Sequence, residues 1–198
     1  MIEVRALQGG QTGAAVALLA RAMRDNPVHL AAFGADPDRR RRSLEQMFGT
    51  FFRVFSRQEP LCAVDGTSLV AVSGVAPAGT CQPSPGQRLR FLPGLLLMGA
   101  GTSRRVNTWL GIWAEHDPDE PHSHLGPLAV DATLQGRGIG SQVMTEYCAR
   151  LDAAGQVGYL ETDKPENVRF YERHGYTVSG EAAVLGVPNW FMLRRPGQ

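Results

Sequence analysis

The chain has 198 residues, 43% of them hydrophobic, and a formal net charge of +1. This length suggests one domain with its own buried core, and the near-neutral charge gives no general attraction to nucleic acid or to a membrane surface. Three widely spaced cysteines exclude a disulfide framework, and no apolar run approaches a membrane span, so we expect a cytoplasmic protein.

Strands and helices are expected to alternate from the first residues onward. Hydrophobic periodicity predicts a strand at 2–7, helices at about 12–24 and 39–52, and strands at 61–64 and 69–75. Asp65-Gly66 between the last two strands is a strong hairpin signal. The run Arg39 to Arg42 suggests nucleic-acid binding, but no second basic patch or interleaved aromatic residue accompanies it. We therefore interpret these arginines as the solvated first turn and face of a helix.

An insertion precedes the C-terminal strands. Residues 77–86 have the composition of a loop, residues 91–113 predict one or two helices broken near Gly99, and residues 115–120 form an acidic loop. The pattern then predicts a strand at 124–130, a helix at 139–154, a strand at 157–161, a helix at 165–174, and strands at 176–178 and 189–194.

This order predicts an α+β fold, or three-layer α/β arrangement, in which one mixed sheet is flanked by helices. The strands at 124–130 and 157–161 should be parallel, because a whole helix crosses between them. We expect one domain over 1–198, with an irregular or helical insertion at about 77–123.

Three alternating glycines lie in the segment Gln135 to Ser141, between a strand and a helix. Glycines at such a turn leave backbone N–H groups unshielded, and the positive end of the helix dipole lies behind them, so the turn predicts a phosphate-binding site. The alternative is that the glycines only permit close packing.

Two common phosphate motifs fit this turn poorly. A P-loop requires a lysine before Ser141, and none is present. A dinucleotide fingerprint requires a third glycine where Ser141 stands, and no second mononucleotide-binding half follows in the chain.

Two longer stretches resemble the motifs of one family. Leu128-Ala129-Val130-Asp131 through Gln135-Gly136-Arg137-Gly138-Ile139-Gly140 resembles the acyl-CoA-binding motif of the GCN5-related N-acetyltransferase (GNAT) family. Tyr159-Leu160-Glu161-Thr162 and Asn167-Val168-Arg169-Phe170-Tyr171-Glu172-Arg173-His174-Gly175-Tyr176 resemble its second motif, at the usual distance. The alternative that the glycines only permit close packing does not account for the second motif.

The resemblance implies a twisted mixed sheet whose two central parallel strands splay apart, with acetyl-CoA entering the V between them. Backbone groups of Leu128 and Val130 would pair with the pantetheine arm, and the N–H groups of the glycine turn would hold the pyrophosphate. Gly126-Pro127 suits the splay, because proline cannot donate to a sheet ladder. The implied cofactor-binding residues are Leu128, Ala129, Val130, Gln135, Gly136, Arg137, Gly138, Ile139, Gly140, Ser141, Asn167, Phe170 and Tyr171.

The resemblance also implies an acetyltransferase in which an amine attacks the thioester directly. Tyr171 matches the tyrosine that protonates the departing CoA thiolate. We expect His124, and secondly Glu161, to accept the proton of the amine. Many family members carry an asparagine where this chain has Lys164, and whether Asn167 replaces its contact stays open.

The acceptor and the other partners are less defined by the sequence. We expect a small-molecule amine first and a peptide or protein amine second, with a noncatalytic acyl-CoA-binding module as the rival interpretation. An aromatic surface at Phe91, Trp109 and Trp113, and the acidic residues Glu115, Asp117, Asp119 and Glu120, would suit a cationic acceptor; the alternative is core tryptophans beside a solvated loop. The assembly state, including a homodimer, stays open.

Three histidines raise the question of a metal. His122 and His124 lie two residues apart, a spacing at which both can share one ion, and His116 precedes them. No cysteine or carboxylate lies at a supporting interval, so we expect no metal.

Overall fold

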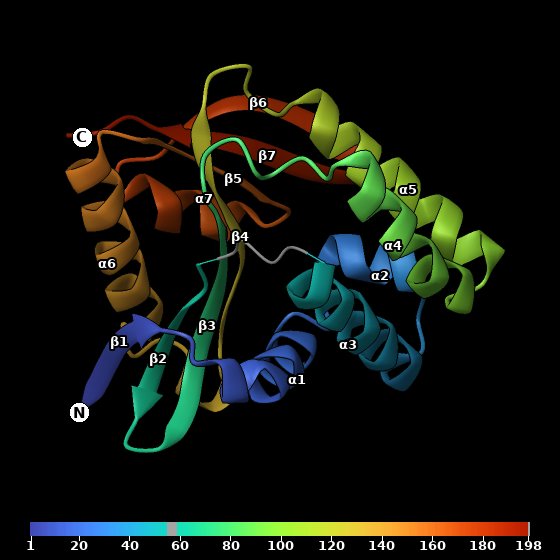
Figure 1. Ribbon diagram of the computed structural model, residues 1–198, viewed down its shortest axis with the longest axis horizontal. Helices are drawn as coiled ribbons and strands as arrows, with labels where there is room; N and C mark the ends of the chain where they lie inside the picture. The colour runs from blue at the N-terminus through green and yellow to red at the C-terminus, as the bar shows by residue number, and fades with distance from the viewer. Residues whose placement is uncertain (55–58, 198) are drawn as a thin grey trace.

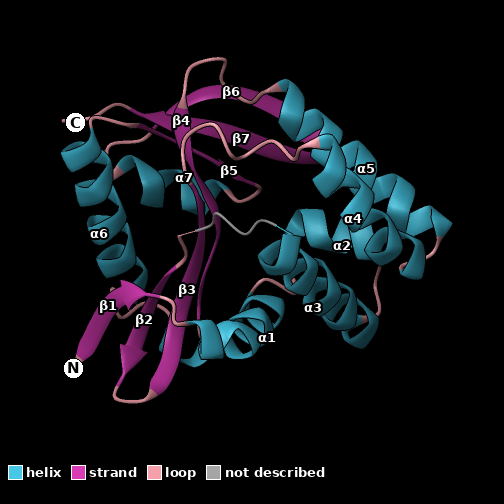
Figure 2. Cartoon of the chain, viewed as in Figure 1, coloured by secondary structure: helices cyan, strands magenta, loops and turns pink. Residues whose placement is uncertain are grey.

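The computed structural model describes residues 1–54 and 59–197. Its centre is a seven-stranded mixed sheet in the order β1-β2-β3-β4-β5-β7-β6, drawn in Figures 1 and 2. The strands are β1 (Ile2–Ala6), β2 (Leu61–Asp65), β3 (Ser68–Ala76), β4 (His122–Val130), β5 (Val157–Thr162), β6 (Thr177–Val184) and β7 (Val187–Arg194). The central pair β4 and β5 is parallel, as the sequence predicted, and the other neighbouring pairs are antiparallel.

Helices cover both faces of this sheet, which makes three layers (Figure 2). One core joins α6 (Ile139–Ala154) and α7 (Pro165–Glu172) to one face, and a second core joins the remaining helices to the other face. Those helices are α1 (Thr12–Ala22), α2 (Pro27–Phe33), α3 (Pro37–Val54), α4 (Pro85–Leu97) and α5 (Ala100–Glu115); short 3-10 turns occupy Gly9–Gln11 and Ala132–Leu134. The predicted α+β fold is thereby confirmed.

The helix after the glycine turn illustrates how the sequence produces these layers. Its buried side chains recur at helical spacing: Ile139, Val143, Met144, Tyr147, Cys148 and Leu151. Burying each large apolar side chain of this face stabilises the fold by about 1.5–3 kcal/mol. The helix ends at Gly155, whose φ of 61° is a left-handed conformation that favours glycine.

One helix was missed. Residues 27–33 form α2, which has only seven residues and therefore too few turns to show a clear hydrophobic period. Its first turn is completed from far along the chain: the backbone N–H of Val28 donates to Asp163 Oδ2 at 2.8 Å. A local sequence pattern cannot report such a cap.

The prediction that the arginine run faces solvent is wrong for Arg40. This side chain is buried; its Nε donates to Arg24 O at 2.6 Å and its Nη1 to Gly34 O at 2.7 Å. It also forms an ion pair with Asp25. Arg39 is exposed, as expected, so only part of the run faces solvent.

The C-terminal hairpin is longer than predicted. Strand β6 runs to Val184 because its residues pair with β7, although Ser179-Gly180-Glu181-Ala182-Ala183 carries little strand propensity. Among the helices of the described chain, none combines the length and the apolar character that crossing a bilayer requires.

Candidate active site

A β-bulge in β4 decides which side chains face which core. Ser73 pairs with Leu128 and Val75 with Leu125, so Gly74 alone opposes both Gly126 and Pro127. Such a bulge reverses the alternation of the strand. Leu125 therefore belongs to the core under α6, whereas Ala129 belongs to the opposite core.

The two parallel strands separate just before this bulge. Pairing between β4 and β5 covers only His122 to His124 and Val157 to Tyr159. Beyond it, β4 continues to Val130 along β3, while β5 continues to Thr162 along β7. The sheet thus opens into a V, and Leu128, Ala129 and Val130 line it.

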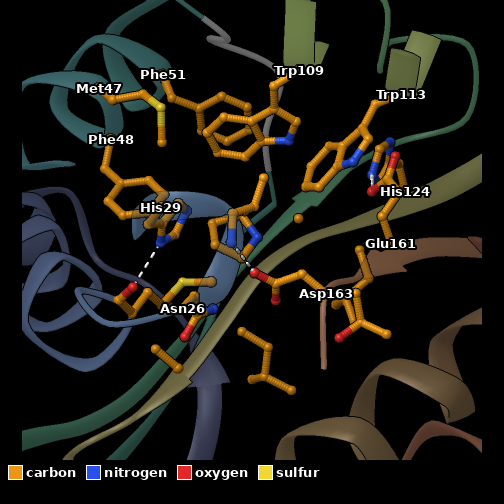
Figure 3. A pocket seen from close by; sticks show the side chains of 18 of the residues that line it. Asn26, His29, Met47, Phe48, Phe51, Trp109, Trp113, His124, Glu161 and Asp163 are labelled. Carbon is orange, nitrogen blue, oxygen red and sulfur yellow. Dashed lines mark hydrogen bonds and ion pairs between the residues drawn. The ribbon is translucent and has the colours of Figure 1, made fainter. Parts of the chain in front are cut away.

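A cleft of about 1050 Å³ fills this V and extends to both ends of it. At one end lie the turn residues Gln135, Gly136, Gly138, Ile139, Gly140 and Ser141. At the other end lie aromatic residues of α3, α4 and α5. Figure 3 shows Phe48, Phe51, Trp109 and Trp113 on one side of this region and His124, Glu161 and Asp163 on another. The predicted cofactor and acceptor regions are therefore parts of one cleft.

The glycine turn has the backbone conformation that an anion site requires. Gly136 and Gly138 have φ values of 76° and 77°, a left-handed region that side chains disfavour. Gly138 caps α6 without a side-chain hydrogen bond, so the first N–H groups of the helix stay open. Gln135 Nε2 donates to Val130 O at 3.2 Å and ties the turn to the strand. Arg137 is exposed and is not among the residues that line the cleft.

Helix α7 contributes the second motif. Tyr171 is 7% exposed and lines the cleft, as do Asn167 and Phe170. Burial, with Asp163 and Glu161 nearby, raises the pKa of Tyr171, so its hydroxyl stays protonated at neutral pH. Asn167 Nδ2 donates to Thr162 Oγ1 at 3.1 Å and joins the helix to the end of β5.

His124 and Glu161 meet where the strands part. The two come from adjacent strands, and Nε2 of His124 lies 2.8 Å from Oε2 of Glu161. Both side chains line the cleft. Burial lowers the pKa of His124, but the Glu161 carboxylate and Cys81 outweigh it and raise the pKa to about 10. The pair therefore holds a proton between two groups and acts as one unit.

The sequence did not predict that Cys81 and Asp117 join the two histidines. Cys81 Sγ lies 3.4 Å from Asp117 Oδ2 and 3.5 Å from His122 Nε2. The residues come from the loop after β3, the loop after α5 and β4, so spacing along the chain gives no signal. His116, the third histidine of the sequence pattern, lies apart: its ring stacks on Phe191 at 4.1 Å and its Nδ1 contacts Ile112 O.

The aromatic end of the cleft is partly core. Trp109 is 3% exposed and packs edge-on against Trp113 at 5.1 Å between ring centroids, yet both line the cleft with Phe91. Nε1 of Trp109 is buried without a hydrogen-bond partner among the described residues.

Of the four residues of the acidic loop, Asp117 lines the cleft, whereas Glu115, Asp119 and Glu120 do not. Asp163, which sequence reasoning missed, adds a second acidic side chain beside Glu161.

Comparison with known proteins shows which family and which solved structures this chain is similar to. Residues 52–176 match the model of the acetyltransferase (GNAT) family. A protein from Corynebacterium glutamicum described as a histone acetyltransferase and related acetyltransferase is similar over 100% of this chain and 97% of its own, with a TM-score of 0.75 and 20% identity. An agmatine N-acetyltransferase covers 98% of this chain and 99% of its own (TM-score 0.66, 15% identity). A polyamine N-acetyltransferase from Drosophila melanogaster covers 98% and 100% (TM-score 0.63, 15% identity).

At these identities the solved structures establish the fold, and the family model, which spans more than half of the chain, establishes the family. The chain belongs to the GNAT family of acetyltransferases, and this membership implies acetyl-CoA as the co-substrate.

Proposed function

We propose that this acetyltransferase transfers the acetyl group to the primary amine of a small molecule, by direct attack within a ternary complex. One observation carries the proposal: a single cleft joins the glycine turn, Tyr171 and the His124–Glu161 pair to an aromatic end lined by Trp109 and Trp113. Donor and acceptor can therefore meet without a covalent enzyme intermediate.

The donor would lie along β4. Backbone groups of Leu128 and Val130 would bind the pantetheine arm, and the open N–H groups at Gly138, Gly140 and Ser141 would bind the pyrophosphate. A backbone N–H near Leu128 would stabilise the oxyanion that develops on the thioester carbonyl. Asn167 and Phe170 line the same part of the cleft.

Two proton transfers would accompany the reaction. The amine nitrogen forms its bond to the carbonyl carbon and gives its proton to the His124–Glu161 pair. We expected His124 to be the first acceptor, but its pKa is raised to about 10, so it already holds a proton at neutral pH and Glu161 is the free acceptor of the pair. The carbon–sulfur bond then breaks, and the thiolate takes a hydrogen bond and a proton from the Tyr171 hydroxyl. Burial raises the pKa of Tyr171, so its hydroxyl holds the proton tightly. The hydroxyl can protonate the thiolate only while the thiolate lies beside it in the cleft, away from water.

The acceptor would carry an apolar body and a cationic amine. Trp109, Trp113 and Phe91 offer apolar surface and ring faces to a cation, and Asp117, Glu161 and Asp163 supply negative charge. Two of the similar structures are described as acetylating small amines, and one as related to a histone acetyltransferase. Aromatic rings and carboxylates gathered in one cleft suit a compact cationic amine, which favours the small molecule over a peptide.

The amine panel is the direct test. CoA release would be measured with polyamines, agmatine, arylalkylamines and histone peptides, and acetyl-CoA binding would be measured by calorimetry. We expect turnover on at least one small amine. Tight acetyl-CoA binding without turnover on any amine would support the noncatalytic module, and preference for peptides would overturn the small-molecule assignment.

We also propose a cytoplasmic location. Cys62, Cys81 and Cys148 are all unpaired thiols, which suits a reducing compartment.

A further inference from the structure

Four side chains converge beside the acceptor end of the cleft, and two of them, Cys81 and His122, take no part in the proposed acetyl transfer. Cys81, Asp117, His122 and His124 each offer one ligand atom, and these atoms all lie within 4.8 Å of one another. We call these four residues the Cys81 cluster. Its donors are one sulfur, one carboxylate oxygen and two imidazole nitrogens.

The spacing of the donors fits a tetrahedral metal centre. Ligands at the usual 2.0–2.3 Å from Zn²⁺ lie about 3.3–3.8 Å from one another in a tetrahedron. In the cluster, His122 Nε2 lies 3.2 Å from Asp117 Oδ1 and 3.5 Å from Cys81 Sγ. Cys81 Sγ lies 3.4 Å from Asp117 Oδ2. A small movement of these side chains would bring all of them to one ion.

Each histidine already has its other ring nitrogen fixed by an acceptor. Nδ1 of His122 lies 2.9 Å from Glu120 O, which leaves Nε2 directed at Cys81 and Asp117. Nε2 of His124 lies 2.8 Å from Glu161 Oε2, which leaves Nδ1 as its remaining donor. Carbonyl and carboxylate partners of this kind orient most histidine ligands of metals. Gln82 Nε2 orients Asp117 in the same way, at 2.8 Å from Oδ2.

Within the part of the chain that the structure describes, one polar atom of the Cys81 cluster is left without a hydrogen-bond partner. Oδ1 of Asp117 is buried and has no hydrogen bond of good geometry among the described residues, although His122 lies near it. The side chains of His122 and Asp117 are only 4% and 12% exposed, so water is largely excluded. A buried carboxylate oxygen beside a thiol and two imidazoles is a site for a cation.

We propose that the Cys81 cluster binds one divalent transition-metal ion, and that Zn²⁺ fits its sulfur, nitrogen and oxygen donors best. Four protein ligands complete a tetrahedral shell, which is typical of structural zinc. The ion would join the loops that carry Cys81 and Asp117 to β4 and so fix the wall of the acceptor end. It would also bind His124, so that Glu161 would be the proton acceptor in the transfer.

Metal content and cobalt spectra test this proposal without using turnover. Untagged full-length protein would be dialysed against Zn²⁺ and then against buffer, and its zinc would be measured by mass spectrometry. We expect one equivalent to be retained. Replacement with Co²⁺ should give the visible bands of tetrahedral cobalt and a thiolate-to-cobalt charge-transfer band.

Matched variants assign the ligands. Cys81→Ser should abolish the charge-transfer band, and His122→Gln should lower zinc affinity at least about tenfold. Cys148→Ala, which removes a different thiol, should leave both unchanged. Circular dichroism would establish that each variant is folded. Retention of no zinc by the wild type, or a charge-transfer band that survives Cys81→Ser, would overturn the proposal. Both results would leave the acetyl-transfer proposal intact, because that proposal is tested by turnover.

Discussion

His124, the last β4 residue that pairs with β5, lies 2.8 Å from Glu161, which stands two residues beyond the last paired residue of β5, where the sheet opens. Pairing with Tyr159 of β5 fixes His124, and pairing with Phe191 of β7 fixes Glu161, while beyond His124 the two central strands make room for the donor. The same splay therefore creates the binding cleft and positions the proton-accepting pair at its apex.

Removing the carboxylate of this pair should slow the reaction. Glu161→Gln keeps the shape and a hydrogen bond to His124 but cannot take a proton, so we expect kcat/KM to fall about 10²-fold or more. Glu172→Gln, an exposed change on α7, serves as the control and should have wild-type kinetics. Unchanged kinetics in Glu161→Gln would show that the amine loses its proton elsewhere.

The hydroxyl of Tyr171 should matter for the chemical step. Tyr171→Phe removes the proton donor for the thiolate while retaining the buried ring, so we expect kcat to fall about 10²-fold with little change in acetyl-CoA affinity. Tyr176→Phe is a matched control, because that ring is also buried and lies 6.0 Å from Tyr171, outside the cleft lining. Equal losses in both variants would remove the catalytic role of Tyr171.

One pair of variants can distinguish a role of the glycine turn in donor binding from a general effect on stability. Gly138→Ala and Gly155→Ala both place a side chain at positive φ, 77° and 61° respectively, and each should cost about 1–2 kcal/mol of stability. Only Gly138 lies in the cleft, so only its variant should raise the KM for acetyl-CoA. Equal KM values, measured by CoA release, would contradict a role of the turn in donor binding.

Buried Arg40 should contribute strongly to stability. Arg40→Met leaves the carbonyls of Arg24 and Gly34 without their charged donor, so we expect a loss of about 2–4 kcal/mol in the free energy of unfolding. Arg39→Met changes an exposed neighbour and should stay within about 0.5 kcal/mol. Urea unfolding of both variants gives the comparison, and similar losses would contradict the structural role of Arg40.

A salt bridge near the C-terminus predicts a pH dependence. Two contacts of 2.8 Å with Arg194, and the N–H of Gly197, lower the pKa of Asp152 to about 2. A lowered pKa means that this stabilisation is fully present above the unfolded pKa of about 3.9 and is lost as the pH falls toward 2. The stability difference between wild type and Asp152→Asn should therefore shrink between about pH 6 and pH 3. A constant difference would contradict the assignment.

The features that follow from local chemistry were predictable from the sequence. The glycines at 136 and 138 adopt the left-handed conformation for which only glycine is well suited, and α6 begins directly after them. The helix expected between β4 and β5 likewise predicted that these two strands are parallel. Each of these features depends on a short stretch of the sequence and not on contacts with distant parts of the chain.

Contacts between residues that lie far apart in the sequence were not predictable. Cys81 and Asp117 reach His122 only because two loops fold over the end of β4, and α2 begins where Asp163 caps it. The bulge in β4 places Gly126 and Pro127 opposite the single residue Gly74 of β3, and so decides which core Leu125 and Ala129 face. No periodicity within a single segment reports these contacts.

A crystal structure of the protein with acetyl-CoA would test the central claim most directly. We expect the pyrophosphate against the N–H groups at Gly138 to Ser141, the pantetheine arm along Leu128 to Val130, and the thioester sulfur within hydrogen-bond distance of the Tyr171 hydroxyl. Acetyl-CoA bound elsewhere, or a V that stays closed to it at saturating concentration, would contradict the proposed donor site.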